Sequence, residues 1–318
     1  MKIHSNDDPL CFQQPVRGYI GREVKDTLEK VDYVPEAHVR IWRNTQLDGY
    51  DLHFHSAVEV IIGVENTYHV STGSQEYLIN AGDILIIPPN ISHSISSHEQ
   101  GTRFICLFDI EFITSLYDYK ALSPVFLSPY LCSSRENPIL HEKIHSSFMK
   151  IIDAYFSNKI MWEFAIYSEL LHVLVDIGTH HYETAMSDVH SYEKRSTENY
   201  DKLANLMHYI DLHYSEELSL EQAADIVGFS KFHFSRIFKD YTNNTFYDYL
   251  TRKRIQEAQK LLATDMSVTE ICFKTGFNNP TSFCRSFKKY TLFSPSEYRS
   301  LIKEENLSEH CDNIQTKQ

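Results

Sequence analysis

The sequence Ser219-Leu-Glu-Gln-Ala-Ala-Asp-Ile-Val-Gly228 decides the fold of the C-terminal part of the chain, and a second copy of its pattern opens at Ser267. Each copy begins with a capping box, a serine followed three residues later by Gln or Glu, which starts a helix. Nine residues after each serine comes Gly-Phe, and a glycine there ends a helix in a turn. A short helix is predicted after each glycine, so the pattern predicts two helix-turn-helix units.

The second helix of each unit combines aromatic and basic residues. The first copy reads Phe234-Ser-Arg-Ile-Phe-Lys239 and the second reads Phe283-Cys-Arg-Ser-Phe-Lys288. Helical spacing places the phenylalanines on one face and the basic residues on another, which is typical of a helix that enters the major groove of DNA. The alternative is an ordinary helical bundle whose aromatic residues are simply core.

These motifs resemble the signature of AraC/XylS-type transcriptional regulators, over roughly residues 200–302. The segments that carry the resemblance are Ala223–Ser230, Phe234–Lys239, Arg254–Leu262, Ile271–Phe277, Phe283–Lys289 and Ser294–Arg299. Two positions depart from it, because Asn244 and Leu292 stand where the family usually has glycine. Asparagine tolerates a left-handed backbone, whereas leucine adopts one only with strain.

Length and charge are consistent with a two-domain DNA-binding protein. A chain of 318 residues is long enough for two domains. Residues 1–199 hold 15 Lys/Arg and 27 Asp/Glu, whereas residues 229–303 hold 13 Lys/Arg and 6 Asp/Glu. The basic block marks where a polyanion would bind. The six cysteines lie far apart without a C-x-x-C pair, which predicts reduced thiols. Without a signal peptide or a long apolar run, we expect a soluble cytoplasmic protein with no membrane partner.

The N-terminal part is predicted to be a β-domain. After an irregular arm over residues 1–35, with a strand-like piece at Val16–Ile20, short β-branched and aromatic runs occupy His38 to Asp109, which implies a sandwich or barrel. The runs are Val39–Trp42, Glu59–Gly63, Tyr68–Val70, Gln75–Ile79, Asp83–Ile87 and Arg103–Phe108.

Histidines and a carboxylate form a candidate binding site in this β-domain. His53-x-His55-x3-Glu59, with Gly82–His93 about 30 residues on, resembles the two motifs of the cupin barrel. We expect His53, His55 and Glu59 on one strand face, converging with His93. Three imidazoles and a carboxylate suit a divalent transition metal. The alternatives are hydrogen-bonding groups of a sugar-type pocket and satisfied interior polar residues. We predict effector binding by these four residues and no cofactor.

Two amphipathic helices are predicted over 138–182. One apolar stripe is Ile144, Phe148, Ile151, Ile152 and Tyr155, and the other is Phe164, Tyr167, Leu170, Leu171, Leu174 and Val175. By resemblance they mediate a homodimer; the alternative is that they only pack on the barrel. The predicted fold is therefore α+β: a cupin-like barrel with two appended helices over 1–182, a linker over 183–199, an all-α domain over 200–303 and a polar tail over 304–318.

The predicted DNA contacts come from the outer faces of the two recognition helices. They are Ser230, Lys231, His233, Arg236 and Lys239 in the first, and Asn278, Asn279, Thr281, Ser282, Arg285, Lys288 and Lys289 in the second. A long helix from Phe246 to Ala263 joins the units, which predicts binding to successive major grooves about 34 Å apart. In that helix Arg254 is expected to point inward, while Arg252 and Lys253 reach phosphate or solvent.

The predicted function is sequence-specific regulation of transcription in response to a small effector, such as a sugar. The partners are double-stranded promoter DNA, the effector, a second copy of the chain and RNA polymerase, and activation is the expected sign by resemblance. The chain is not predicted to be an enzyme. The competing hypothesis is a metal-dependent cupin enzyme with an accessory DNA-binding domain. A third is a constitutive DNA-binding protein with a vestigial barrel.

Overall fold

The computed structural model describes residues 23–303 except 26, 32, 35–36, 46–48, 73–74, 158–159, 187–192 and 243. The strand-like piece predicted at Val16–Ile20 and the tail over 304–318 lie outside these residues. The chain divides into two compact units, one built mainly from residues 29–184 and the other mainly from residues 185–318. The first is a β-domain with appended helices and the second is helical, so the predicted α+β fold is confirmed.

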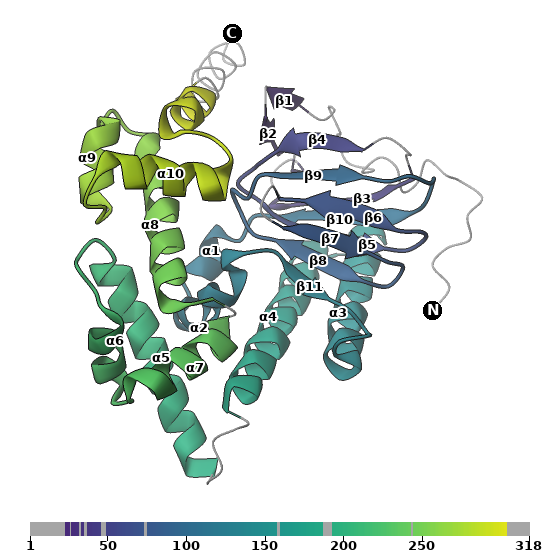
Figure 1. The fold of residues 1–318 in the computed structure, drawn as a ribbon. Coiled ribbons are helices and arrows are strands. Elements are labelled where there is room, and N and C mark those ends of the chain that lie inside the picture. Colours follow the sequence, from purple (N-terminus) through teal and green to yellow (C-terminus); the bar gives the residue numbers. More distant parts are fainter. Residues whose placement is uncertain are drawn as a thin grey trace. The chain divides into compact units, whose positions relative to one another are not determined.

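The first unit contains two facing sheets whose neighbouring strands are antiparallel (Figure 1). The five-stranded sheet has the order β11 (Tyr130–Cys132), β8 (Ile84–Ile87), β5 (Val58–Gly63), β10 (Arg103–Phe108) and β3 (Val39–Asn44). The four-stranded sheet has the order β4 (Tyr50–His53), β9 (His93–Ser96), β6 (Tyr68–Ser71) and β7 (Glu76–Ile79). Strands β1 (Glu23–Lys25) and β2 (Leu28–Lys30) form a separate pair. The strands predicted from the sequence do not include β1, β2, β9 or β11, and they reach β4 only at His53.

Strand alternation separates two apolar layers. On β10, Phe104 and Cys106 pack in one core with Ile144 and Phe148 of helix α3 (Pro138–Phe156). Helix α4 (Trp162–Met186) completes this layer, so both helices cover the outer face of the five-stranded sheet (Figure 1). Between the sheets lies a smaller cluster of Ile61, Tyr68, Val70, Ile79, Leu85, Ile87 and Ile95. Short helices α1 (Glu111–Thr114), α2 (Tyr117–Leu122) and η1 (Ser123–Leu127) connect β10 to β11.

The two helices differ in how well their buried faces were predicted. Every member of the stripe predicted for α3 is buried. The stripe predicted for α4 was partly wrong, since Phe164 is 76% and Val175 63% exposed. The residues buried instead are Ile166, Val173 and Ile177. Apolar residues surround much of this 25-residue helix, so their spacing alone does not identify the inner face.

Within the described residues, the second unit is helical, with six complete helices and a further helical stretch over 295–303. The six helices are α5 (Glu193–His213), α6 (Leu220–Val227), α7 (Lys231–Thr242), α8 (Phe246–Leu262), α9 (Val268–Lys274) and α10 (Pro280–Thr291). Helix α8 contacts α7, α9 and α10, and α5 packs on α6. Because α4 ends at Met186 and α5 begins at Glu193, helical residues occupy both ends of the segment predicted as a linker.

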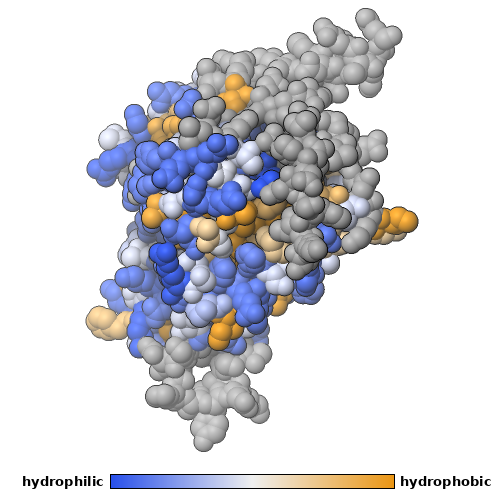
Figure 2. Space-filling model, turned by 90° about the vertical axis from the view of Figure 1, so that its right-hand side faces the viewer, coloured by the Kyte–Doolittle hydropathy of each residue, from blue (hydrophilic) through white to orange (hydrophobic). Residues whose placement is uncertain are grey.

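The face of the molecule seen in Figure 2 is mostly hydrophilic where it is coloured, with hydrophobic residues in separate patches. Within the described part of the chain, no helix is both long and apolar enough to cross a membrane. The four cysteines in that part, Cys106, Cys132, Cys272 and Cys284, are free thiols, as predicted.

Candidate DNA-binding face and effector site

Both predicted helix starts are present. Ser219 accepts a hydrogen bond from the Gln222 backbone N–H, while the Gln222 side chain accepts one from the Ser219 backbone N–H. Ser267 and Glu270 form the same reciprocal pair. Each pair satisfies backbone donors that the first turn of a helix leaves unpaired. The repeated pattern therefore produces the same local structure twice.

The two glycines turn the chain between the helices of each unit. Gly228 has φ of 70° and Gly276 has φ of 83°, both in the left-handed region that glycine adopts without penalty. The glycines differ in their surroundings. A Cβ on Gly228 would meet no atom within 4 Å, whereas a Cβ on Gly276 would lie 2.6 Å from the Ser215 carbonyl oxygen. Only the second turn is packed against neighbouring backbone.

Each recognition helix has one buried and one exposed face. In α7 the side chains of Phe234, Ile237 and Phe238 are buried, and in α10 those of Phe283 and Phe287 are buried, as predicted. Most of the predicted DNA contacts are exposed; only His233 and Ser282 are half-buried. The exposed residues are Ser230, Lys231, Arg236, Lys239, Asn278, Asn279, Thr281, Arg285, Lys288 and Lys289. The helical periodicity thus sorted these residues onto the expected faces.

Several of these exposed side chains already have partners within the domain, Lys231, Asn279 and Lys289 among them. Lys231 forms an ion pair with Glu221. Asn279 is the N-cap of α10 and accepts a hydrogen bond from the Ser282 backbone N–H at 2.8 Å. Lys289 donates to the Tyr290 hydroxyl at 3.1 Å. A base or phosphate contact by any of them competes with, or is added to, an existing interaction.

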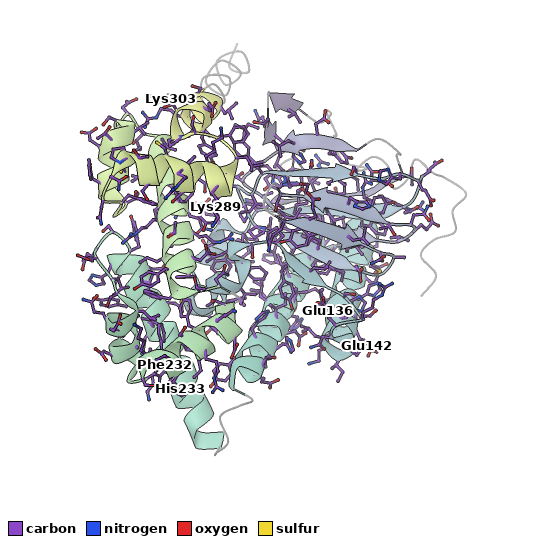
Figure 3. The ribbon with its side chains drawn as sticks, viewed as in Figure 1. Glu136, Glu142, Phe232, His233, Lys289 and Lys303 are labelled. Atoms are coloured by element: carbon purple, nitrogen blue, oxygen red, sulfur yellow. The ribbon has the colours of Figure 1, made fainter. Side chains whose placement is uncertain are left out.

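Phe232, which the sequence analysis did not select, is the most exposed aromatic residue of α7. Its side chain is 87% exposed at the first turn of the helix, next to His233 (Figure 3). It lies four residues before Arg236, and residues at this spacing share a helix face. That spacing was the signal in the sequence that could have identified it.

The basic cluster of α8 faces inward more than expected. Arg254 donates to the carbonyl oxygens of Tyr214 at 2.7 Å and Glu216 at 2.8 Å, as its predicted inner position requires. The prediction for Lys253 was wrong, because it pairs with Asp211 at 2.8 Å and Glu257 at 3.1 Å. Arg252 pairs with Asp248 at 3.2 Å and lies over the Tyr290 ring. The carboxylates of Asp211, Glu257 and Asp248 therefore hold the side chains of Lys253 and Arg252 within the domain.

In the first unit, the four predicted residues of the effector site come together. His53 ends β4, His55 lies in the connection that follows, Glu59 is on β5 and His93 begins β9. The expectation that the first three share one strand was wrong, since the chain passes from one sheet to the other between them. We call this set the His/Glu tetrad. All four side chains are at least 97% buried, and their candidate ligand atoms lie within 4.8 Å of one another.

The hydrogen bonds of the tetrad orient its nitrogens. The Nδ1 atoms contact backbone carbonyl oxygens: that of His53 lies 2.7 Å from Asp51, that of His55 3.2 Å from Ala57, and that of His93 2.8 Å from Ile91. A carbonyl oxygen only accepts, so each Nδ1 carries a proton, and the Nε2 atoms face the buried carboxylates of Glu29 and Glu59. The Nε2 atoms of His55 and His93 both lie 2.9 Å from Glu59 Oε2.

Two acceptors at 2.9 Å repel unless a proton or a cation lies between them. Burial by itself would raise the pKa of Glu59, but the neighbouring imidazoles of His93 and His55 hold it well below its ordinary value. Burial alone would lower the pKa of His93, but Glu59 raises it, so the ionised carboxylate stands beside positive charge from a protonated imidazole or from a bound cation. The tetrad fits a divalent transition metal by donor type, number and convergence.

A further carboxylate, missed in the sequence, borders the tetrad. Glu29 on β2 is buried, and its Oε2 lies 3.4 Å from His53 Nε2. A small cavity lies beside these groups. Its lining is Glu29, His53 and Glu59 together with Trp42, Tyr50, Ile95, Ile105 and Leu107. No motif in the sequence links Glu29 to the tetrad, because it lies 24 positions before His53.

Comparisons with known proteins match the two units separately. A family model described as an AraC-like ligand binding domain matches residues 37–155, and one described as a helix-turn-helix domain matches residues 223–300. An HTH-type transcriptional regulator of Staphylococcus aureus (strain COL) is 36% identical over 109 residues, 34% of this chain and 15% of that protein. One from strain MSSA476 is 26% identical over 76% of this chain and 30% of that protein. The regulatory protein PocR of Salmonella typhimurium is 32% identical over 37% of this chain and 39% of its own length.

The chain thus spans well under half the length of these relatives. Among solved structures, ToxT from Vibrio cholerae aligns with 83% of this chain and 96% of its own at 13% identity, with a TM-score of 0.41. The DNA-binding domain of AdpA, solved in complex with a target DNA, aligns with 33% of this chain and 95% of its own at 28% identity, with a TM-score of 0.32. By its AraC-like ligand-binding domain and its C-terminal helix-turn-helix domain, the chain belongs to the AraC family.

Proposed function

We propose that the chain binds promoter DNA through its two helix-turn-helix units and regulates transcription in response to a small molecule bound in the β-domain. The observation that carries this proposal is the repeated unit: two capped helices, two left-handed glycines and two recognition helices with exposed polar faces. The family assignment and the regulators among its relatives support it. They favour regulation over the alternative of a metal-dependent enzyme.

The exposed residues of the recognition helices divide into two roles. Arginine pairs with the O6 and N7 atoms of guanine, and asparagine with adenine, so we assign Arg236, Arg285 and Asn278 to base reading. Phe232 offers an apolar surface that suits a thymine methyl group. Lysines chiefly contact phosphate and supply salt-dependent affinity, which is the role of Lys239 and Lys288. The other predicted contacts position the helices in the groove.

The DNA-binding proposal is tested by selecting duplexes from a random library with the full chain, then measuring variants on the selected duplex. We expect Arg285→Ala to weaken binding by about 5- to 150-fold and to relax the preference at one base pair. Lys288→Ala should weaken binding to all sequences and lower the salt dependence by about one ion. Lys143→Ala, an exposed lysine on α3, is the control for charge. Failure to enrich any sequence would contradict the proposal.

The effector is proposed to occupy the cavity beside the tetrad, so that His53, His55, Glu59 and His93 form part of its site. Their burial and convergence support this placement. A ligand shifts the DNA-binding state only if it binds two conformations with different affinity. Substituting Glu59→Gln should therefore abolish the effect of an effector on DNA affinity. An effect that survives the substitution would place the effector elsewhere.

The tetrad itself supports a second candidate function, the binding of a divalent metal ion. His53, His55, Glu59 and His93 would hold the ion, and it would supply the positive charge that the paired acceptors at 2.9 Å need. Elemental analysis of purified chain should find about one transition-metal ion per chain. A His93→Ala variant that keeps the same metal content would contradict this assignment.

We also propose that the chain acts as a homodimer, with α4 as the contact, and activates transcription through RNA polymerase. Phe164 and Val175 support the dimer, because they lie eleven residues apart and so on one exposed face of α4. Mass measured by light scattering should fall from dimer to monomer in a Phe164→Glu/Val175→Glu variant. Dimers that persist would assign the contact to another surface. Transcription from a selected promoter, measured with and without the chain, tests the sign of regulation.

A further inference from the structure

Arg103 is a buried charge with no counter-charge among the described residues. It begins β10, and its side chain is fully buried. Within the described part of the chain, none of its three guanidinium nitrogens has a hydrogen-bond partner. The hydroxyl of the neighbouring Tyr68 is also buried without a hydrogen bond of good geometry, although it lies close enough to the guanidinium for the two groups to interact. An unpaired charge and an unpaired hydroxyl in an apolar interior both destabilise the fold, so such groups normally contact something.

The surroundings of Arg103 are aromatic, and no carboxylate of the described residues pairs with it. The guanidinium carbon lies 4.5 Å from the centroid of the Tyr68 ring and 5.5 Å from that of Tyr50. Of its two neighbours across the sheet, Gly63 has no side chain and Asn44 uses its amide to donate to the Tyr50 hydroxyl at 2.5 Å. Aromatic faces attract a cation, but they accept none of its N–H groups in the plane of the guanidinium.

Arg103 lies on the same side of the sheet as the cavity beside the tetrad. Ile105 and Leu107 line that cavity, and Arg103 lies two residues before Ile105, so alternation puts all three on one face. Tyr50 belongs to both places, because it lines the cavity and its ring lies near Arg103. Glu59 pairs with Leu107 and Gly63 with Arg103, which sets the tetrad and Arg103 about 13 Å apart along the strands.

We propose that Arg103 binds the carboxylate of a small organic acid that occupies this interior, and that the effector is therefore an acid. This inference deepens the proposed effector site and rests on it. A guanidinium presents parallel N–H groups that match the two oxygens of a carboxylate, and the buried site makes that match selective. A neutral sugar leaves the charge unpaired. The remainder of the ligand lies along Tyr50 toward the tetrad.

A second buried arginine provides a matched control. Arg40 on β3 is equally buried, and its Nη2 donates to the Tyr33 carbonyl oxygen at 2.8 Å. Replacing Arg40 breaks a hydrogen bond that the folded chain already has. Replacing Arg103 removes a buried charge that, on this proposal, is paired only when the ligand is bound. Methionine has a similar shape and no charge, so Arg40→Met and Arg103→Met make this comparison.

The first measurement is the melting temperature of the full chain after refolding from denaturant, which strips any bound acid. We expect Arg40→Met to melt at least about 4 °C below the unsubstituted chain, and Arg103→Met to melt at the same temperature or higher. An Arg103→Met chain that loses as much as Arg40→Met overturns the proposal, because Arg103 would then be a structural residue.

The second measurement uses sodium salts of short-chain, aromatic and sugar carboxylic acids, each paired with its neutral primary amide. A carboxylate that binds should raise the melting temperature where its amide does not, and Arg103→Met should weaken its Kd by at least about tenfold. Neutral compounds that bind both chains equally would overturn the role of Arg103 but leave the effector-responsive function intact. The DNA selection described above tests that function separately.

Discussion

The two glycine turns allow a quantitative test of how the helix-turn-helix units are built. Gly228→Ala places an L-residue at φ of 70°. The left-handed conformation costs about 1–2 kcal/mol, and the lower entropy of the unfolded chain returns about 0.4–1 kcal/mol, so the net loss is about 1 kcal/mol. Gly276→Ala carries the same penalty and adds a Cβ at 2.6 Å from the Ser215 carbonyl oxygen. Such overpacking costs about 1–3 kcal/mol more, for a total of about 2–4 kcal/mol.

The two units of the chain can be monitored separately during unfolding in urea. Both tryptophans, Trp42 and Trp162, belong to the first unit, so their fluorescence follows that unit alone. Circular dichroism at 222 nm also follows the helices of the second unit. We expect Gly276→Ala to shift the dichroism transition to lower urea by more than twice the shift of Gly228→Ala, with the fluorescence transition unchanged. Equal shifts for the two variants would refute the steric argument.

Two further predictions follow from residues of the same unit. Leu292 ends α10 at φ of 70°, so Leu292→Gly should raise the free energy of unfolding by about 0.5–1 kcal/mol in urea titrations, and Leu292→Asn by less; a loss would show that its side-chain packing matters more. Burial alone would raise the pKa of Glu257, but the ammonium groups of Lys253 and Lys260 hold it below its ordinary value. The charged carboxylate therefore stabilises the fold above about pH 4.3, and this stabilisation is lost as the pH falls through the lowered pKa. Glu257→Gln should make the free energy of unfolding less dependent on pH below about 4.3. Urea unfolding at several pH values measures this.

The helical unit was predictable because its signals are local. A capping box, a left-handed glycine and a 3.6-residue period each act within one or two turns, so Ser219, Gly228 and the buried face of Phe234 could be placed from spacing alone. Lys253 was misplaced because its partner Asp211 lies on another helix, 42 positions earlier. The local sequence around a side chain does not reveal a partner that lies on a distant segment of the chain.

In the β-domain, the sequence predicted which segments form strands better than it predicted how those strands are connected into sheets. The buried run Arg103–Phe108 was recognised as a strand with its observed bounds. His53 and Glu59 were expected on one strand, but the chain changes sheets between them, which a short period-2 pattern does not reveal. Glu29 and Arg103 gave no signal, because their significance lies in what surrounds them after folding: Glu29 borders the tetrad, and Arg103 has no hydrogen-bond partner among the described residues.

Helix α8 has a consequence for how a regulatory sequence could change over time. It runs for 17 residues, about 25 Å, without glycine or proline, and it packs against α7 and α10 alike. The two recognition helices are thereby held by one rod rather than by a flexible tether. One base pair inserted between the two groove segments that the recognition helices contact would rotate the second segment about the DNA axis by about 34–36°. A rigid α8 does not let the second recognition helix follow that rotation. The base sequence of an operator for such a protein can therefore change during evolution, but the number of base pairs between its two contacted segments cannot.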